Sequence, residues 1–270
     1  MISVIVNLDS RAGVGDSIST FTGHNDGARS WDFFTAGLEN KRKFFSGFDH
    51  ELIAYIDETV RIPDEILNRV RELADCVVIR KHFNNYRDCT PFNLANDIRF
   101  LQALMMATGE TIVHFDADCA TFARNQQAVE GWLRHLDTHK FVSYPSQWSP
   151  KPVDDPSFGP HTWASTRSFA CKRVTLLFDE IERALREPEW MWQKYGEPLR
   201  RLNWMEHALS RLNADSVIYP PRDDANLLIF CWSRYATGTL QRLNSQEFDE
   251  VYGYVHSCTG IHYPNDVQGL

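Results

Sequence analysis

The sequence predicts an α/β protein in which helices flank a mainly parallel, mixed β-sheet. Short apolar runs alternate with stretches of helical spacing through the first half of the chain. In the segment Thr111–Asp118, an apolar, β-branched run ends in two acids, Asp116 and Asp118. Strands of open α/β sheets carry ligand-binding groups at this end. The chain is also long enough for such a fold, because 270 residues with 43% hydrophobic content can bury a large core.

The first half begins with three predicted strands and two predicted helices. Apolar runs predict strands at Ile2–Val6, Glu51–Asp57 and Cys76–Ile79. A loosely helical pattern covers Ala28–Leu38. The next helix begins at Pro63, because a proline at the first helical position is followed by acids in the first turn.

A further helix is expected directly before the acidic strand. Thr90-Pro91 marks its start and Gly109 its end. One buried face is indicated by apolar residues at helical spacing, namely Leu94, Ile98, Leu101 and Met105. The resulting β-α-β-α-β-α-β series is typical of a parallel sheet with covering helices.

The second half is less regular. Five of the twelve prolines fall in the segment Tyr144–His161, which predicts an irregular loop across the surface. Strands are expected at Trp163–Cys171, Ser216–Tyr219 and Leu227–Trp232, and helices at Val174–Leu185 and Asn203–Leu212.

Composition excludes several classes of protein. A net charge of −8 argues against non-specific nucleic-acid binding. The six cysteines are scattered without a CxxC pair, which favours free thiols and a cytoplasmic protein. No apolar run approaches the length of a transmembrane helix, and the chain opens on a strand pattern rather than a signal peptide.

Asp116 and Asp118 point to metal chemistry. Two hard oxygen ligands this close suit Mg²⁺ or Mn²⁺, ions that commonly bridge to the phosphates of a substrate. A strand-end turn with solvated acids, or a helix cap, is the alternative.

The segment Thr108–Asp118 resembles the "A-x-G-E-hydrophobic-D-x-D" segment of the GT-A glycosyltransferases, and most closely their family 2-like group. Shorter stretches fall in the order expected for that group, at Ser3–Arg11, Tyr55–Glu58, Trp163–Thr166 and Trp204–Ala208. The resemblance implies a Rossmann-like GT-A fold formed by residues 1–270 as a single domain. Residues 1–120 would bind the nucleotide sugar and residues 121–270 the acceptor.

The resemblance also implies a donor site. Asp116, Ala117 and Asp118 would bind the metal and the nucleotide diphosphate. The ends of the first two strands would contact the nucleotide, with Asn7 and Arg11 at the base or phosphate and Asp57 at the base. Arg99 would pair with the diphosphate. For Asn7, Arg11 and Asp57, the alternative is turn chemistry at strand ends. For Arg99, the alternative is a solvated charge on the helix.

Later residues receive acceptor and metal roles. Glu206 stands where inverting members place a catalytic base, although Asn203 and Glu206 also have capping-box spacing. His262, or else His256, would complete the metal shell, and a structural histidine is the alternative. Trp163, Ser165 and Thr166 suit a sugar ring, while core packing explains Trp163 equally well.

The predicted activity is metal-dependent transfer of a hexosyl or related sugar in glycan biosynthesis, with inversion. The donor would be a UDP, GDP or dTDP sugar, and the acceptor a carbohydrate or other hydroxyl compound. Two alternatives stay open. Phe115–Ala120 partly resembles the nucleophile loop of haloacid dehalogenase-like phosphohydrolases, although Ala120 replaces the expected Thr or Val. A non-catalytic nucleotide- or sugar-binding module is the other.

Overall fold

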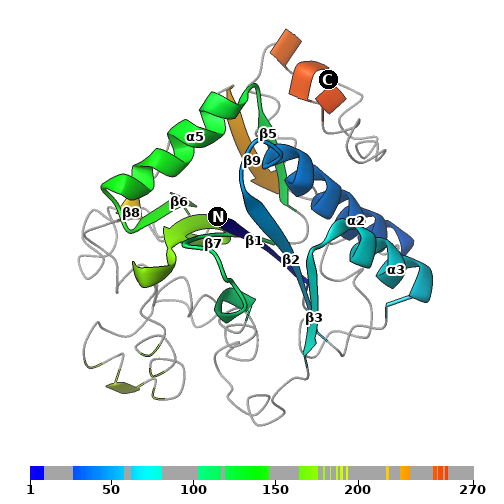
Figure 1. Cartoon of the computed structure of the whole chain (residues 1–270), viewed down its shortest axis with the longest axis horizontal. Coiled ribbons are helices and arrows are strands. Elements are labelled where there is room, and N and C mark those ends of the chain that lie inside the picture. The colour runs from blue at the N-terminus through cyan, green and yellow to red at the C-terminus, as the bar shows by residue number, and fades with distance from the viewer. Residues whose placement is uncertain are drawn as a thin grey trace.

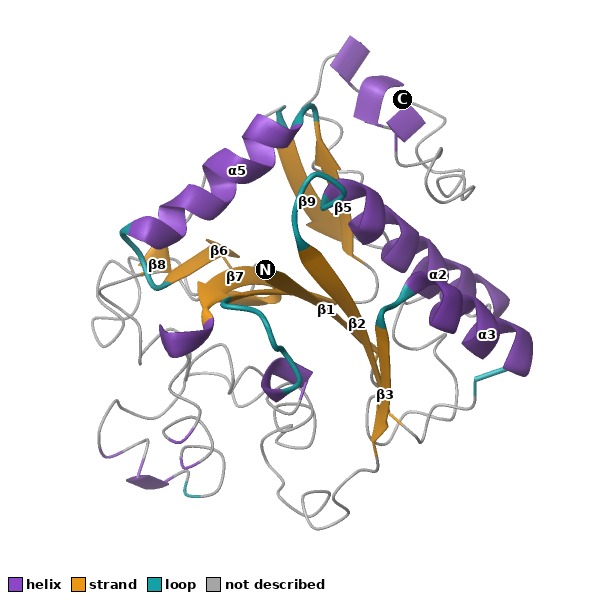
Figure 2. Ribbon diagram, viewed as in Figure 1, coloured by secondary structure: helices purple, strands orange, loops and turns teal. Residues whose placement is uncertain are grey.

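A computed structural model describes residues 1–8, 27–57, 62–80, 103–116, 119–145 and 164–175, with single residues or short stretches between 179 and 193 and between 217 and 254. Its centre is a seven-stranded sheet in the order β3-β2-β1-β4-β7-β6-β8 (Figures 1 and 2). These strands are β3 (Cys76–Arg80), β2 (His50–Asp57), β1 (Ile2–Leu8), β4 (Thr111–Asp116), β7 (Ala164–Lys172), β6 (Phe141–Pro145) and β8 (Val217–Ile218).

The pairing confirms the predicted mainly parallel, mixed sheet. β1 pairs in parallel with both β2 and β4, and β2 does so with β3. β7 is antiparallel to both β4 and β6, while β6 and β8 are parallel. The parallel half contains the strands that the sequence predicts most clearly, and the antiparallel pairings lie in the less regular second half.

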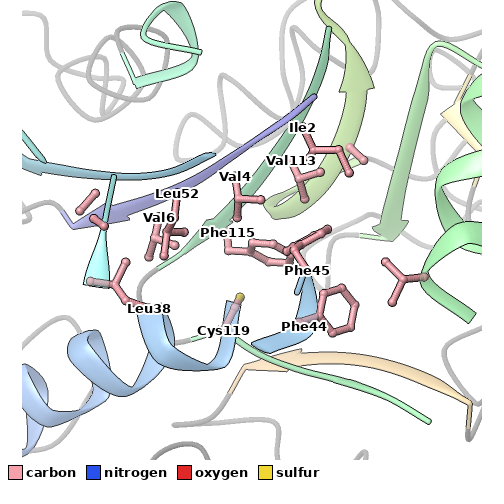
Figure 3. Close-up of a cluster of buried hydrophobic side chains, with 14 of the residues drawn as sticks. Ile2, Val4, Val6, Leu38, Phe44, Phe45, Leu52, Val113, Phe115 and Cys119 are labelled. Carbon is pink, nitrogen blue, oxygen red and sulfur yellow. The ribbon is translucent and has the colours of Figure 1, made fainter. Parts of the chain in front are cut away.

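In the described part of the chain, the helices that flank the sheet and share its core are α2 (Gly27–Phe44), α3 (Asp64–Leu73) and α5 (Gln126–Arg134). Alternate residues of the central strands, Val4, Leu52 and Phe115 among them, enter one hydrophobic cluster with side chains of α2 (Figure 3). Within it, the rings of Phe115 and Phe45 lie 6.2 Å apart. The described residues also include two 3-10 turns, η2 (His135–Asp137) and η3 (Arg173–Thr175).

Two predicted helix boundaries are wrong. α2 extends to Phe44 rather than ending at Leu38, because the polar residues Asn40 and Lys41 are buried in its last part. Pro63 is the N-cap of α3 and not its first helical residue. Its backbone is extended, and its carbonyl accepts the first helical hydrogen bond from the amide of Leu67 at 2.9 Å. Of the helix expected from Thr90, only its last turn at 103–105 lies within the described residues.

A second, two-stranded sheet lies beside α2 (Figure 2). It pairs β5 (Cys119–Ala123) with β9 (Leu227–Cys231) in antiparallel fashion. The sequence pattern predicts β9 but not β5, α5 or β6. β5 escapes prediction because its residues, CATFA, show no alternation between apolar and polar, and its first four residues are all buried.

The amino ends of β1, β2 and β4 are joined through side chains. Ser3 Oγ donates to Glu51 Oε1 and accepts from the amide of Gly109 at 2.7 Å. Thr108 donates to Glu51 Oε1 from its amide at 2.9 Å and its hydroxyl at 2.6 Å. A Cβ at position 109 would lie 2.8 Å from the Met1 carbonyl, so only glycine fits this approach. The described helices include none with the length and apolar character of a membrane span.

Candidate functional site

The carboxyl ends of β1, β2 and β4 place three residues side by side. In the parallel register, Asn7 of β1 is paired with Tyr55 of β2 and with Asp116 of β4. Paired residues on neighbouring strands occupy the same face of a sheet. Asp57, which ends β2, lies two residues beyond Tyr55 and is paired with Arg80 of β3. The sheet therefore brings together the acids and the amide that the sequence assigns to the nucleotide.

β7 reaches the same edge from the opposite direction. Because β7 is antiparallel to β4 and Ser168 is paired with Phe115, the start of β7 lies at the carboxyl end of β4. Ser165 and Thr166 belong to this first part of β7. The backbone that carries the predicted sugar-binding hydroxyls thus begins where the predicted metal-binding strand ends.

Asn7 is the central side chain of this edge. It is only 5% exposed, and among the described residues no group hydrogen-bonds its Oδ1 atom, which is fully buried. An unsatisfied buried acceptor costs about 1–3 kcal/mol. A ligand at the carboxyl edge of the sheet would remove this cost if it brought a hydrogen-bond donor or a cation to Asn7 Oδ1, since a neutral amide oxygen can bind either.

An aromatic floor lies one step back from this edge. His114 is paired with Ile5 on one side and Phe169 on the other, and its ring stacks on that of Phe169 at 5.5 Å. His114 and Phe169 are both buried. Cys171 lies on the same strand as Phe169, and burial raises the pKa of its thiol, so it stays protonated and contributes only packing. The polar edge of the sheet therefore lies next to a buried, largely aromatic layer.

The helix α2 holds the strand that follows the acids. Asn40 Nδ2 donates to the carbonyl of Thr121 at 2.8 Å, and Asn40 Oδ1 accepts from the Thr121 amide and hydroxyl, each at 2.8 Å. The neighbouring Lys41 donates to the carbonyl of Cys119 at 2.5 Å. Sequence reasoning missed both residues, because they belong to the polar run Glu39–Lys43 near the end of α2, which is typical of a solvated helix end.

For several predicted site residues the structure describes the backbone alone: Asp57, Asp116, Ser165 and Thr166. Others lie outside the described residues: Arg11, Arg99, Ala117, Asp118, Trp163, Glu206, His256 and His262. The part of the chain that is described holds no cluster of three or more acids, histidines or cysteines able to bind a metal. The observation that favours a cation or a hydrogen-bond donor as ligand is therefore the buried Oδ1 of Asn7, a residue that is paired with Asp116 in the sheet.

Comparisons with known proteins support the fold. The sequence matches no family model and none of the curated proteins. Among solved structures, the galactosyltransferase LgtC in complex with donor and acceptor sugar analogues matches with a TM-score of 0.55 at 10% identity, covering 99% of both chains. An active-site mutant of LgtC matches with a TM-score of 0.50 at 9% identity, covering 82% of this chain and 73% of its own. The order and direction of the strands, together with these matches, show that the chain has the GT-A fold.

Proposed function

We propose that the protein is a metal-dependent glycosyltransferase that moves a sugar from a nucleoside diphosphate to a hydroxyl acceptor. The observation that carries this proposal is the convergence of Asn7, Asp57 and Asp116 at one edge of a GT-A sheet. Ligands of open α/β sheets bind outside the carboxyl ends of the strands. The structural match to a galactosyltransferase solved with donor and acceptor analogues supports the same class of reaction.

Asp116 and Asp118 would hold Mn²⁺ or Mg²⁺, and His262 or His256 would complete the metal shell. Carboxylates suit these hard cations, and Asn7 Oδ1 adds a neutral oxygen to the same edge. When bound, the ion supplies positive charge to the diphosphate. The chain as a whole is acidic, with a net charge of −8, so the metal ion would provide the positive charge that the diphosphate needs.

The donor would lie across the ends of β1 and β2. Asn7 and Asp57 offer acceptor oxygens to the N–H and O–H groups of a base and ribose. Arg11 and Arg99 would pair with the diphosphate, since the planar guanidinium fork matches phosphate oxygens. Because the floor formed by His114 and Phe169 is buried, these polar contacts would form against a low-dielectric base and gain strength from it.

The acceptor would lie at the start of β7, with Trp163 against the sugar ring and Ser165 and Thr166 at its hydroxyls. Glu206 would take the proton of the acceptor hydroxyl as its oxygen attacks the anomeric carbon. The bond between that carbon and the diphosphate breaks in the same displacement, which inverts the anomeric configuration.

We also propose that residues 1–270 form a single domain, with residues 1–120 binding the donor and residues 121–270 the acceptor. The match over 99% of the chain to one galactosyltransferase supports this extent. A cytoplasmic location is part of the proposal. In the described part of the chain, Cys76 and Cys171 are free thiols, as expected of a reducing compartment.

A panel of UDP, GDP and dTDP sugars, screened for Mn²⁺-dependent hydrolysis or transfer, tests the proposal. Activity should disappear with EDTA and with Asp118→Asn. It should persist in the control Asp137→Asn, which changes an exposed acid in η2. Phosphate release from simple phosphomonoesters would instead show a phosphohydrolase. Metal-dependent UDP binding without turnover on any acceptor would show a binding module.

A further inference from the structure

We propose that Cys119 and Cys231 form a redox-sensitive pair that closes to a reversible disulfide between β5 and β9. The antiparallel register of the two-stranded sheet pairs Cys119, the first residue of β5, with Cys231, the last residue of β9. The two cysteines lie far apart in the sequence, so its pattern gives no sign of the pairing. The proposal is independent of the predicted metal and donor sites.

The hydrogen-bond pattern of this sheet makes Cys119 and Cys231 a non-hydrogen-bonded pair. Arg124 and Asn226 continue the register by one step beyond the ladder, and the Arg124 amide donates to the Asn226 carbonyl at 2.9 Å. Theirs is therefore a hydrogen-bonded pair. Bonded and non-bonded pairs alternate along antiparallel strands. Cys119 lies an odd number of positions from Arg124, so its pair with Cys231 is of the non-bonded kind.

Contacts with α2 agree with this assignment. In a non-bonded pair, the amide and the carbonyl of each residue point away from the partner strand. The amide and the carbonyl of Thr121 both bond the side chain of Asn40, each at 2.8 Å, and so cannot serve β9. The Cys119 carbonyl likewise accepts from Lys41 Nζ. Thr121 and Cys119 therefore both occupy non-bonded positions, as the alternation from Arg124 requires.

A non-bonded pair has the spacing that a disulfide needs. Its Cα atoms lie about 4.5 Å apart, and its Cβ atoms are closer than those of a hydrogen-bonded pair. Disulfides join residues with Cα atoms about 4.4–6.8 Å apart and Cβ atoms about 3.5–4.5 Å apart. Cys119 and Cys231 can therefore be bridged without a change in the register of β5 and β9.

The pair lies where the sheet opens most readily. Cys119 is only 4% exposed and belongs to the hydrophobic cluster that α2 shares (Figure 3). A thiol buried in apolar surroundings is inert while the protein is closed. The described ladder ends at this pair, and the ends of a short ladder open more easily than its middle. Oxidation would therefore follow local separation of β5 from β9, and the disulfide would then hold the two strands together.

The oxidant is a small-molecule disulfide such as glutathione disulfide. The thiolate of one cysteine attacks a sulfur of that disulfide, which forms a mixed disulfide and releases one glutathione thiolate. The thiolate of the other cysteine attacks the protein sulfur of the mixed disulfide, which closes the Cys119–Cys231 bond and releases the second glutathione. The two thiol protons pass to the two glutathione thiolates, so the protein loses two electrons and the glutathione disulfide gains them. A reversible bond suits the proposed cytoplasmic location, because disulfides of cytosolic proteins are usually transient and redox-sensing.

Equilibrating the folded protein in glutathione buffers of fixed ratio tests the proposal, with a low urea concentration that promotes local opening. Peptide mapping without reduction identifies any cross-linked peptides, and melting curves compare the oxidised with the reduced protein. We expect a cross-link between the peptides that carry Cys119 and Cys231, and its loss in excess reduced glutathione. The cross-link should raise the melting temperature by about 4–16 °C.

Single variants test the assignment of the two cysteines. Cys119→Ala and Cys231→Ala should each abolish the cross-link and the rise in melting temperature. Cys171→Ala is the matched control, because Cys171 is also a buried strand residue but is paired with Ile112 and Phe141, and it should change neither result. A cross-link to Cys119 that persists in Cys231→Ala overturns the proposal. Should neither variant fold, the wild-type map decides the matter, since recovery of both cysteines as thiols in excess glutathione disulfide overturns the proposal by itself.

Discussion

Replacing Asn40 by alanine should destabilise the protein strongly, because one side chain satisfies three buried groups of a single residue. Asn40→Ala removes the partner of the Thr121 carbonyl, amide and hydroxyl, each now bonded at 2.8 Å. Both residues are buried, so water does not replace the lost partner freely. Each buried group left unsatisfied costs about 1–3 kcal/mol.

Three such losses sum to at least about 3 kcal/mol, and single substitutions rarely exceed about 5 kcal/mol, so we expect a fall of about 3–5 kcal/mol in the free energy of unfolding. For a chain of this size, that corresponds to a melting temperature lower by roughly 6–20 °C. Urea unfolding followed by fluorescence, with melting curves alongside, measures both. Asn68→Ala is the matched control, since Asn68 is exposed on α3 and should change stability by less than about 0.5 kcal/mol.

Asn40→Asp provides a second comparison. Aspartate keeps the acceptor for the Thr121 amide but loses the donor to the Thr121 carbonyl, so its effect should fall between wild type and alanine. A loss below about 1 kcal/mol in Asn40→Ala would refute the reasoning. It would mean that β5 finds other partners and that the link between α2 and β5 is not a main support of that strand.

Three further predictions concern the two edges of the sheet. Burial raises the pKa of Glu51, but hydrogen bonds from Ser3 and Thr108 outweigh it and hold that pKa below its ordinary value of 4.5. The Glu51 carboxylate therefore stabilises the protein above pH 4.5, and this stabilisation is lost as the pH falls through the lowered pKa. In Glu51→Gln, the free energy of unfolding in urea should depend less on pH across that range. Gly109→Ala should cost about 1–3 kcal/mol in the same assay, because its Cβ would lie 2.8 Å from the Met1 carbonyl oxygen and 2.9 Å from the Ser3 amide nitrogen. Asn7→Leu should raise the melting temperature of the free protein, because it removes a buried oxygen to which no described residue donates, yet it should weaken nucleotide binding in calorimetry. A variant that binds UDP like wild type would contradict the role of Asn7.

The parallel half of the sheet could be predicted because each of its strands has a clear pattern in the local sequence. β1, β2, β3 and β4 are apolar runs with clear ends, and β4 ends at Asp116 as expected. Parallel strands bring their carboxyl ends to one edge, so Asn7, Asp57 and Asp116 follow from pattern and topology together. The register that sets Asn7 beside Asp116 is a pairing between distant segments, and only the structure supplies it.

The support behind this edge could not be predicted in the same way. The sequence pattern predicts that Asn40 and Lys41 are exposed to solvent, because both are polar. It does not show the hydrogen-bond partners that allow polar side chains to be buried in a core. Their partners are the backbone of β5, a strand without alternation that is some 80 residues away in the chain. Tertiary contact decides both features: β5 forms where α2 can hold it, and the last part of α2 is buried because β5 covers it.

The floor and the edge of the site are linked by the two-residue period of the strands. Ile5 and Asn7 occupy one face of β1, and His114 and Asp116 occupy the matching positions of β4. A register shift of one residue in β1 would move both Ile5 and Asn7 to the other face of the sheet, and a shift in β4 would do the same to His114 and Asp116. The packing of His114 on Phe169 and of Ile5 beside it therefore fixes the register that sets Asn7 next to Asp116. Mutations that loosen the packing of these buried residues should therefore weaken nucleotide binding even when the chain stays folded. The polar residues at the edge depend on this packing for their register.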